Sequence, residues 1–354
     1  MKHIKHYIAQ SVWGAVIAVL IVIVSLDTIS ELVDQLGDLK GQYNFSEAVI
    51  YVLLTIPSSV YEYLPLSSLV GCLIGLGTLA STSELVVMRA AGVSVNQIIW
   101  CVARPVLVFI AAGTIIGEFI APYSDQYADS RRALRQGHEK ALEREQGVWN
   151  REGNEYMHFN AVLPNGKLYG VTRFTFDEMG NLTQARFADS AIYQQDQDWF
   201  EQDIDVTRFM EDEIKHEHYE TAIWHSEISP DLLNVLVLEA DDLPMQRLHT
   251  YSNYLDKQNL DASEYRLAFW HKALQPLASL SLVMIAISFI LGPLRQVTMG
   301  FRVFIGVIVG LVFQTSQKLL GPSSIIWGFS PMFAVLIPIS VCFIVGFVFI
   351  RKSN

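Results

Sequence analysis

Charged residues and cysteines are both scarce in this sequence. Only 17% of its 354 residues are charged, whereas an ordinary soluble domain carries about 25%. The three cysteines, Cys72, Cys101 and Cys342, all fall inside apolar runs, so the polar middle of the chain must fold without disulfides. His216 and His218 could share one face of a strand, but no further ligand spacing accompanies them, and we expect no bound metal.

Motifs for catalysis and nucleotide binding are also missing. The sequence has no G-x-x-x-x-G-K-[ST] loop, no G-x-S-x-G elbow and no H-E-x-x-H pair. The net charge of −11 excludes the basic footprint that nucleic-acid-binding proteins carry. We therefore expect no catalytic residue, no cofactor bound by this chain and no nucleic-acid partner.

The sequence does contain long apolar runs, in two groups of three. A helix needs about 20 mostly apolar residues to cross the hydrocarbon core of a bilayer. The second run is longer than that and contains Pro57 and Pro65, so it predicts a tilted or broken helix. The six predicted spans cover residues 7–29, 49–80, 98–121, 267–291, 303–320 and 331–350.

The acidic residues are concentrated in one insert. Residues 123–265 hold 28 acidic and 13 basic residues, a net charge of −15, while the flanks are slightly basic. This change in composition predicts three parts. They are a first membrane half (residues 1–122), a central soluble domain with flanking helical segments (123–265) and a second membrane half (266–354).

Basic residues in short loops predict the orientation, because cytoplasmic loops are enriched in Lys and Arg. With the N-terminus inside, the cytoplasmic segments carry one acid, Glu84, against seven basic residues: Lys2, Lys5, Arg89, Arg295, Arg302, Arg351 and Lys352. The loop at residues 31–47, on the other side, has four acids against Lys40. We expect both termini in the cytoplasm and the acidic insert outside.

The insert has the pattern of a β domain. Short alternating runs at residues 148–149, 156–159, 167–176, 185–193, 199–209 and 214–224 are separated by turn signals. This pattern is typical of a sandwich or barrel-like sheet. Before the sheet, residues 123–145 favour a helix that continues the third span, and after it residues 245–258 favour a short amphipathic helix.

The most informative stretch is GCLIGLGTLASTSELVVMRAAGVSV, residues 71–95. It predicts a short helix near residues 83–89, with Ser81, Thr82 or Ser83 as cap and Glu84 in the first turn. Such a helix between two spans can act as a lever, because a cytoplasmic motor that grips it moves both spans. A plain amphipathic connector fits the same residues equally well.

This stretch resembles the coupling segment of the LptF/LptG permeases, the membrane subunits of a lipopolysaccharide export ABC transporter. Further similar segments follow in order along nearly the whole chain, and the resemblance is closer to the LptG branch. These segments are VDQL (33–36), GEFIAP (117–122), residues 248–277, GPLR (292–295), MGFRV (299–303) and GP (321–322).

The resemblance implies a fold and a function. The fold is a membrane α-helical bundle of six transmembrane helices (3+3) with an inserted periplasmic all-β, jellyroll-like domain. The function is extraction of lipopolysaccharide from the bacterial inner membrane and its transfer to a periplasmic bridge towards the outer membrane of a Gram-negative cell. The implied partners are an LptF-like permease, an LptB-like ATPase dimer that uses ATP and Mg²⁺, an LptC-like single-span protein, a jellyroll bridge protein, lipopolysaccharide and membrane lipid. The ATPase contact is expected in the coupling segment at about 81–95, at Ser83, Glu84, Leu85, Met88 and Arg89.

The resemblance also places the first and fifth spans at the gates of a substrate cavity. Glu62, within the Pro57–Pro65 interruption, is our best candidate for a polar role there. Lys40 is the only basic residue in the loop where the family meets substrate phosphates. In the fifth span the candidates are Phe304, Gly306, Gly310, Phe313, Gln314 and Gln317. For each glycine, simple helix packing is an equally good explanation, as it is for Gly71 and Gly75.

The charge of the insert opposes long-range attraction of an anionic substrate. If the domain handles lipid, we expect an apolar groove, with Phe174, Phe176, Ile192, Phe200 and Ile204 as inward candidates, although plain core is the more economical interpretation. Two other functions remain open from composition and topology. One is a permease of another ABC system, for lipoprotein export or periplasmic mechanotransmission, and the other is a non-transporting membrane receptor.

Overall fold

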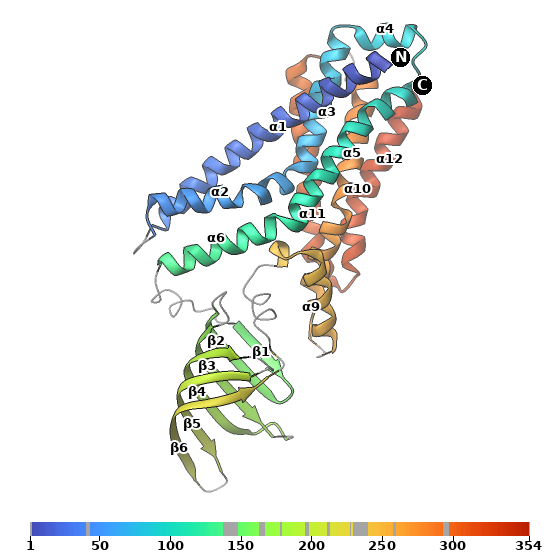
Figure 1. The fold of residues 1–354 in the computed structure, drawn as a ribbon. Helices are drawn as coiled ribbons and strands as arrows, with labels where there is room; N and C mark the ends of the chain where they lie inside the picture. Colours follow the sequence, from blue (N-terminus) through green and yellow to red (C-terminus); the bar gives the residue numbers. More distant parts are fainter. Residues whose placement is uncertain are drawn as a thin grey trace.

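The structure is a computed structural model in which the chain forms a helical bundle and, at one end of it, a curled β-sheet (Figure 1). It describes residues 2–39, 43–136, 148–162, 167–177, 179–194, 198–210, 213–226, 228, 240–257, 260–292 and 297–353. Six helices are long and apolar enough to cross a membrane, which confirms the six predicted spans. The β-strands lie between the third and fourth of them, as expected of an inserted β domain.

The helices before the sheet are α1 (Lys2–Gly37), α2 (Phe45–Glu62), α3 (Leu64–Ser81), α4 (Glu84–Ala90), α5 (Val95–Phe119) and α6 (Ala121–Gln136). After the sheet come the 3₁₀ turn η1 (Ala240–Asp242), α9 (Met245–Lys257), α10 (Ser263–Leu291), α11 (Met299–Trp327) and α12 (Pro331–Ser353). The third span continues into α6 as predicted, although residues 137–145 of that prediction lie outside the described part of the chain.

The long second apolar run is broken into two helices. Tyr63 separates α2 from α3, and Pro65 occupies the first turn of α3, where its missing N–H removes no helical hydrogen bond. Only α3 has the length and composition of a span, whereas α2 runs beside α6 on the outer side of the bundle (Figure 1). Arg131 of α6 forms an ion pair of 2.6 Å with Glu47 of α2, which helps to hold the two helices together. The predicted break is therefore confirmed.

Glycines allow α1 and α3 to touch backbone to backbone. A Cβ added to Gly75 would lie 2.8 Å from the Cα of Val12, and one added to Gly71 would overlap Val16. Any larger residue would push these helices apart, so the packing interpretation of Gly71 and Gly75 is confirmed.

The six predicted strand regions all form strands, which pair antiparallel in the order in which they occur in the chain. They are β1 (Val148–Glu152), β2 (Glu155–Val162), β3 (Lys167–Phe176), β4 (Leu182–Gln194), β5 (Asp198–Phe209) and β6 (Ile214–His225). The described strands make one sheet with no crossover, so of the expected sandwich or barrel-like sheet the structure shows a single sheet that bends over itself rather than two separate sheets.

The bend follows one row of residues across the sheet, which we call the crease. At this row the regular pairing is interrupted among the described strands, and Gly170 and Asp203 have positive φ angles of 58° and 54°. The crease consists of Asn160, Gly170, Asp189, Asp203 and Glu220.

The crease reverses which face of each strand is buried. Residues three apart on a regular strand point to opposite faces. Nevertheless Leu168 and Val171 of β3 are both buried, and so are Ala188 and Ala191 of β4. One apolar core therefore forms between the two halves of the sheet, and the rings of Phe159 and Trp224 meet there, 6.4 Å apart.

This reversal corrects most of the predicted groove positions. Ile204 is fully buried in the core, as expected of an inward residue. Phe174 and Ile192 lie next to buried residues of their strands and face outward. The alternation of apolar and polar residues in the sequence continues through the crease, but beyond the crease the opposite set of positions faces the core. Phe176 and Phe200 also lie outside the buried core cluster and are only partly covered.

A buried ion-pair cluster also joins the two halves. The Glu201 carboxylate is fully buried and lies 3.2 Å from the Arg173 guanidinium, and it also pairs with Arg186. Burial lowers the pKa of Arg173, and the charges of Glu201 and Glu155 oppose that shift. The interior of the domain is therefore partly ionic, whereas the sequence indicated an apolar interior, either a plain core or, if the domain handles lipid, a groove.

We predict that Gly170→Ala destabilises the sheet by about 2–4 kcal/mol, because the new methyl group combines a positive φ with overlap of the Asn160 side chain. Gly180→Ala is the matched control, since it also has a positive φ but open space around it, and should cost only about 1 kcal/mol. Hydrogen exchange of the β2–β5 amides in the full-length protein measures the difference. Equal protection in both variants would contradict the crease.

Candidate functional site

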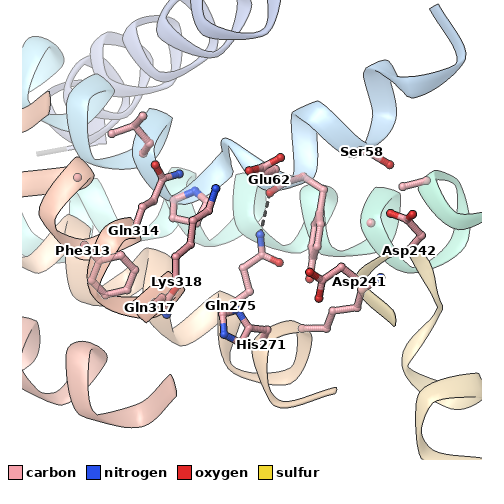
Figure 2. A pocket seen from close by; sticks show the side chains of 18 of the residues that line it. Ser58, Glu62, Asp241, Asp242, His271, Gln275, Phe313, Gln314, Gln317 and Lys318 are labelled. Atoms are coloured by element: carbon pink, nitrogen blue, oxygen red, sulfur yellow. Dashed lines mark hydrogen bonds between the residues drawn. The ribbon is translucent and has the colours of Figure 1, made fainter. Parts of the chain in front are cut away.

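A cavity of about 360 Å³, lined by charged, polar and apolar residues, opens where the broken second span meets α10 and α11. Figure 2 shows Gln314, Gln317 and Lys318 of α11 on one side and Asp241 and Asp242 on the other, with Glu62 and Gln275 between them. The remaining lining residues are Ser58, Tyr61, Pro65, Leu66, Gly117, Ala121, Pro122, Asp125, His271, Lys272, Ala278, Leu282, Gly310 and Phe313.

Residues of three other helices support the break that creates this cavity. Asp27 of α1 accepts hydrogen bonds of 2.7 Å from both Ser59 and Tyr63. Gln275 of α10 donates to the backbone carbonyl of Tyr61 at 2.7 Å, which Figure 2 shows as a dashed line. Gly117 of α5 leaves space for the Tyr61 ring, because any Cβ there would overlap it. The break is thus a supported structure rather than a frayed helix end.

The cavity carries charges of both signs. Four acidic side chains line it, against Lys272 and Lys318. Lys272 is buried and lies 5.9 Å from the centre of the Tyr61 ring, while Ser58 donates a hydrogen bond to the buried Asp125. Apolar residues line much of the rest, among them Leu66, Ala278, Leu282 and Phe313. Such a mixed lining offers contacts to both the polar head and the acyl chains of an amphiphile.

The predicted cavity residues divide into two groups. Glu62, Gly310, Phe313, Gln314 and Gln317 all line the cavity. Outside this group, Phe304 is 59% exposed on the bundle surface, and Gly306 is buried against Leu73 of α3. Lys40 lies outside the described residues.

Sequence reasoning missed the contribution of the segments that flank the insert. Asp125 of α6 and Asp241 and Asp242 of η1 come to the cavity from the two ends of the β domain. The returning chain is held there, because the Glu118 carboxylate accepts hydrogen bonds of 2.9 and 3.1 Å from the N–H of Met245 at the start of α9. Only the acidic character of residues 241–242 after the sheet gave a signal in the sequence.

The predicted short helix is α4, at the far end of the bundle near both termini (Figure 1). Ser83 is its N-cap residue, in a left-handed conformation and without a side-chain capping bond. Glu84 occupies the first turn as predicted and accepts hydrogen bonds from Thr82 at 2.9 Å and Tyr7 at 3.5 Å. The helix is therefore tied to the end of α3 and to α1.

The exposed face of α4 differs from the predicted contact set. Leu85 and Met88 are 5% and 9% exposed and pack into the main core of the bundle, so they anchor the helix. Val86, Val87 and Arg89 are exposed instead. The two valines were not predicted, because the phase of a seven-residue helix is not determined by its sequence alone.

We predict that Gln275→Leu lowers the stability of the bundle by about 1–3 kcal/mol, because the Tyr61 carbonyl loses its side-chain donor in a partly buried place. Thermal unfolding of the detergent-solubilised protein measures this loss. Gln317→Leu, the same change elsewhere in the cavity lining, is the control. Equal unfolding temperatures for the two variants would contradict the bridging role of Gln275.

Comparison with known proteins agrees with this architecture. The family model described as "Lipopolysaccharide export system permease LptF/LptG" matches residues 6–352. The chain is 34% identical over 344 residues to "Lipopolysaccharide export system permease protein LptG" of Haemophilus influenzae, covering 97% of this chain and 96% of that protein. It is 32% identical over 354 residues to the protein of the same name from Escherichia coli K12, covering 99% and 98%. The chain therefore belongs to the LptF/LptG family of lipopolysaccharide export system permeases.

Proposed function

We propose that this chain is the LptG-type permease subunit of an ABC transporter that extracts lipopolysaccharide from the inner membrane and passes it to a periplasmic bridge. The observation that carries the proposal is the family match over residues 6–352, which includes the membrane helices, the short helix α4 and the inserted sheet. A non-transporting receptor would not need α4, and a permease of another ABC system would be expected to match another family.

The proposed topology has both termini and α4 in the cytoplasm and the β domain in the periplasm. It is supported by the concentration of basic residues near α4 and the termini, and by the position of α4 beside both chain ends in Figure 1. The proposed partners are an LptF-like permease, an LptB-like ATPase dimer that binds ATP and Mg²⁺, an LptC-like single-span protein and a bridge protein. This chain itself would bind no nucleotide.

The β domain is proposed to join its neighbours through the edges of its sheet. β1 and β6 are the edge strands, and the 12-residue β6 exposes Ile214 and Ile223. An open edge presents unpaired backbone groups that can pair with a strand of another jellyroll. The ionic interior argues against a purely apolar lipid groove and therefore favours a docking role for the domain.

We predict that Glu84→Ala uncouples the transporter at its ATPase contact. The expected result is about tenfold weaker binding of the ATPase, or continued ATP hydrolysis with little transport, because an interfacial carboxylate is lost. Co-purification and ATPase assays in proteoliposomes measure both effects. Glu264→Ala, on an exposed position in the first turn of α10, is the control. Normal assembly and transport by Glu84→Ala would disprove the assignment of α4.

We predict that a photo-crosslinking residue at Gln314 captures lipopolysaccharide from the cavity, and that one at Phe304 captures it at the lipid-facing gate. Gly306 and Phe313 are less suitable, because both are buried and a bulky probe would disturb the packing. A probe at Phe347, exposed on α12, is the control. Capture of protein neighbours alone from both test positions would contradict the cavity assignment.

A further inference from the structure

Arg302 lies in a place that its charge does not predict. The concentration of basic residues assigns it to a cytoplasmic loop, yet it sits in the first turn of α11 and is only 1% exposed. Its Nη1 atom donates a hydrogen bond of 2.5 Å to the backbone carbonyl of Gly77 in α3. A buried guanidinium is costly to desolvate, so its position calls for a specific role.

Gly77 is suited to receive this arginine. A Cβ at Gly77 would lie 3.0 Å from Nη1 and 3.2 Å from Cδ of Arg302, so only glycine lets the guanidinium approach the helix backbone without displacement. The accepting carbonyl lies one turn before the end of α3 at Ser81. Arg302 is therefore hydrogen-bonded to α3 one helical turn before the connection that leads to α4.

The connection from α4 to α3 is short and ordered. Thr82 and Ser83 alone separate the two helices, and their N–H groups donate to the carbonyls of Thr78 and Ala80, each at 3.2 Å. With Leu85 and Met88 packed into the core, a displacement of α4 is not absorbed by a flexible linker and passes into the end of α3, as well as into α1 through Glu84 and Tyr7.

α3 and α11 also interlock beyond Arg302. Gly306 and Gly310 of α11 receive the side chains of Leu73 and Leu66 of α3 so closely that a Cβ at either glycine would overlap them. Arg302, Gly306 and Gly310 are spaced four apart and lie on one face of α11. Further along the same helix, Gln314 and Gln317 line the cavity.

We infer that Arg302 is a positioning residue that couples α4 to the cavity, because it fastens α11 to the end of α3 that α4 moves. A motion applied to α4 passes through Gly77 and Arg302 into α11 and changes the position of Gln314 and Gln317. This inference rests on the proposed function, in which an ATPase acts on α4 and the substrate occupies the cavity.

The test measures lipopolysaccharide released per ATP hydrolysed by the complete transporter in proteoliposomes. Arg302→Met keeps the length of the side chain but removes its donors. We expect assembly and ATP hydrolysis close to wild type and about tenfold less lipopolysaccharide per ATP, the effect of losing a hydrogen bond to a charged group. Arg302→Lys, which keeps a charged donor, should recover most of the ratio. Arg104→Met, the same change on an exposed position of α5, should leave it unchanged.

The ratio of lipopolysaccharide released to ATP hydrolysed distinguishes a loss of coupling from a general structural defect. A structural defect would lower assembly, ATP hydrolysis and release together, and the ratio would stay unchanged. If Arg302→Met does not assemble, Gly77→Ala tests the same contact from α3, since alanine favours the helix but displaces the guanidinium. A wild-type ratio in Arg302→Met would overturn the inference. If Arg302→Met does not assemble, a wild-type ratio in Gly77→Ala would overturn it. A wild-type complex that releases no lipopolysaccharide would instead refute the proposed function and this inference with it.

Discussion

A break in a helix leaves backbone N–H and C=O groups without their helical partners, and where the break is covered by other helices these groups must be satisfied from within the protein. The break at Tyr63 is where this chain meets that constraint. Asp27, Gln275 and Gly117 come from α1, α10 and α5, and they hold the two broken ends and leave space for the Tyr61 ring. The cavity exists because these helices converge there, and Glu62 lines it because it is the last residue of α2.

α3, which begins at that break, is the helix through which the bundle is connected. Gly71 and Gly75 of this helix contact α1. Leu66 and Leu73 pack against Gly310 and Gly306 of α11, and α4 follows directly after the last turn of α3. Close-packed interfaces of this kind transmit displacement because they cannot be compressed. The same residues that stabilise the bundle therefore connect the end that carries α4 to the cavity.

The β domain solves a different problem, since an uninterrupted sheet of six sequential strands leaves one face open to water. The crease bends the sheet so that its two halves cover each other, and the Glu201 ion pairs close the interior. Breaking a buried pair of this kind leaves an uncompensated charge, so the cluster favours one arrangement of the two halves. The domain gains a fixed shape while its edge strands stay available for pairing.

The amino-acid sequence by itself determined the six spans, the acidic insert, the six strands and the short helix with Glu84 in its first turn. Each of these depends on local hydrophobicity, alternation or capping, which neighbouring residues decide. The tertiary structure decided which face of each strand is buried, because positive φ angles at Gly170 and Asp203 reverse the pattern without any change in alternation. It also decided that Leu85 and Met88 anchor α4, and that Asp125, Asp241 and Asp242 meet in one cavity. Arg302 shows most clearly what the sequence does not determine. The distribution of basic residues predicts that it lies in a cytoplasmic loop, but its guanidinium is buried and donates to the carbonyl of Gly77, 225 positions earlier in the chain.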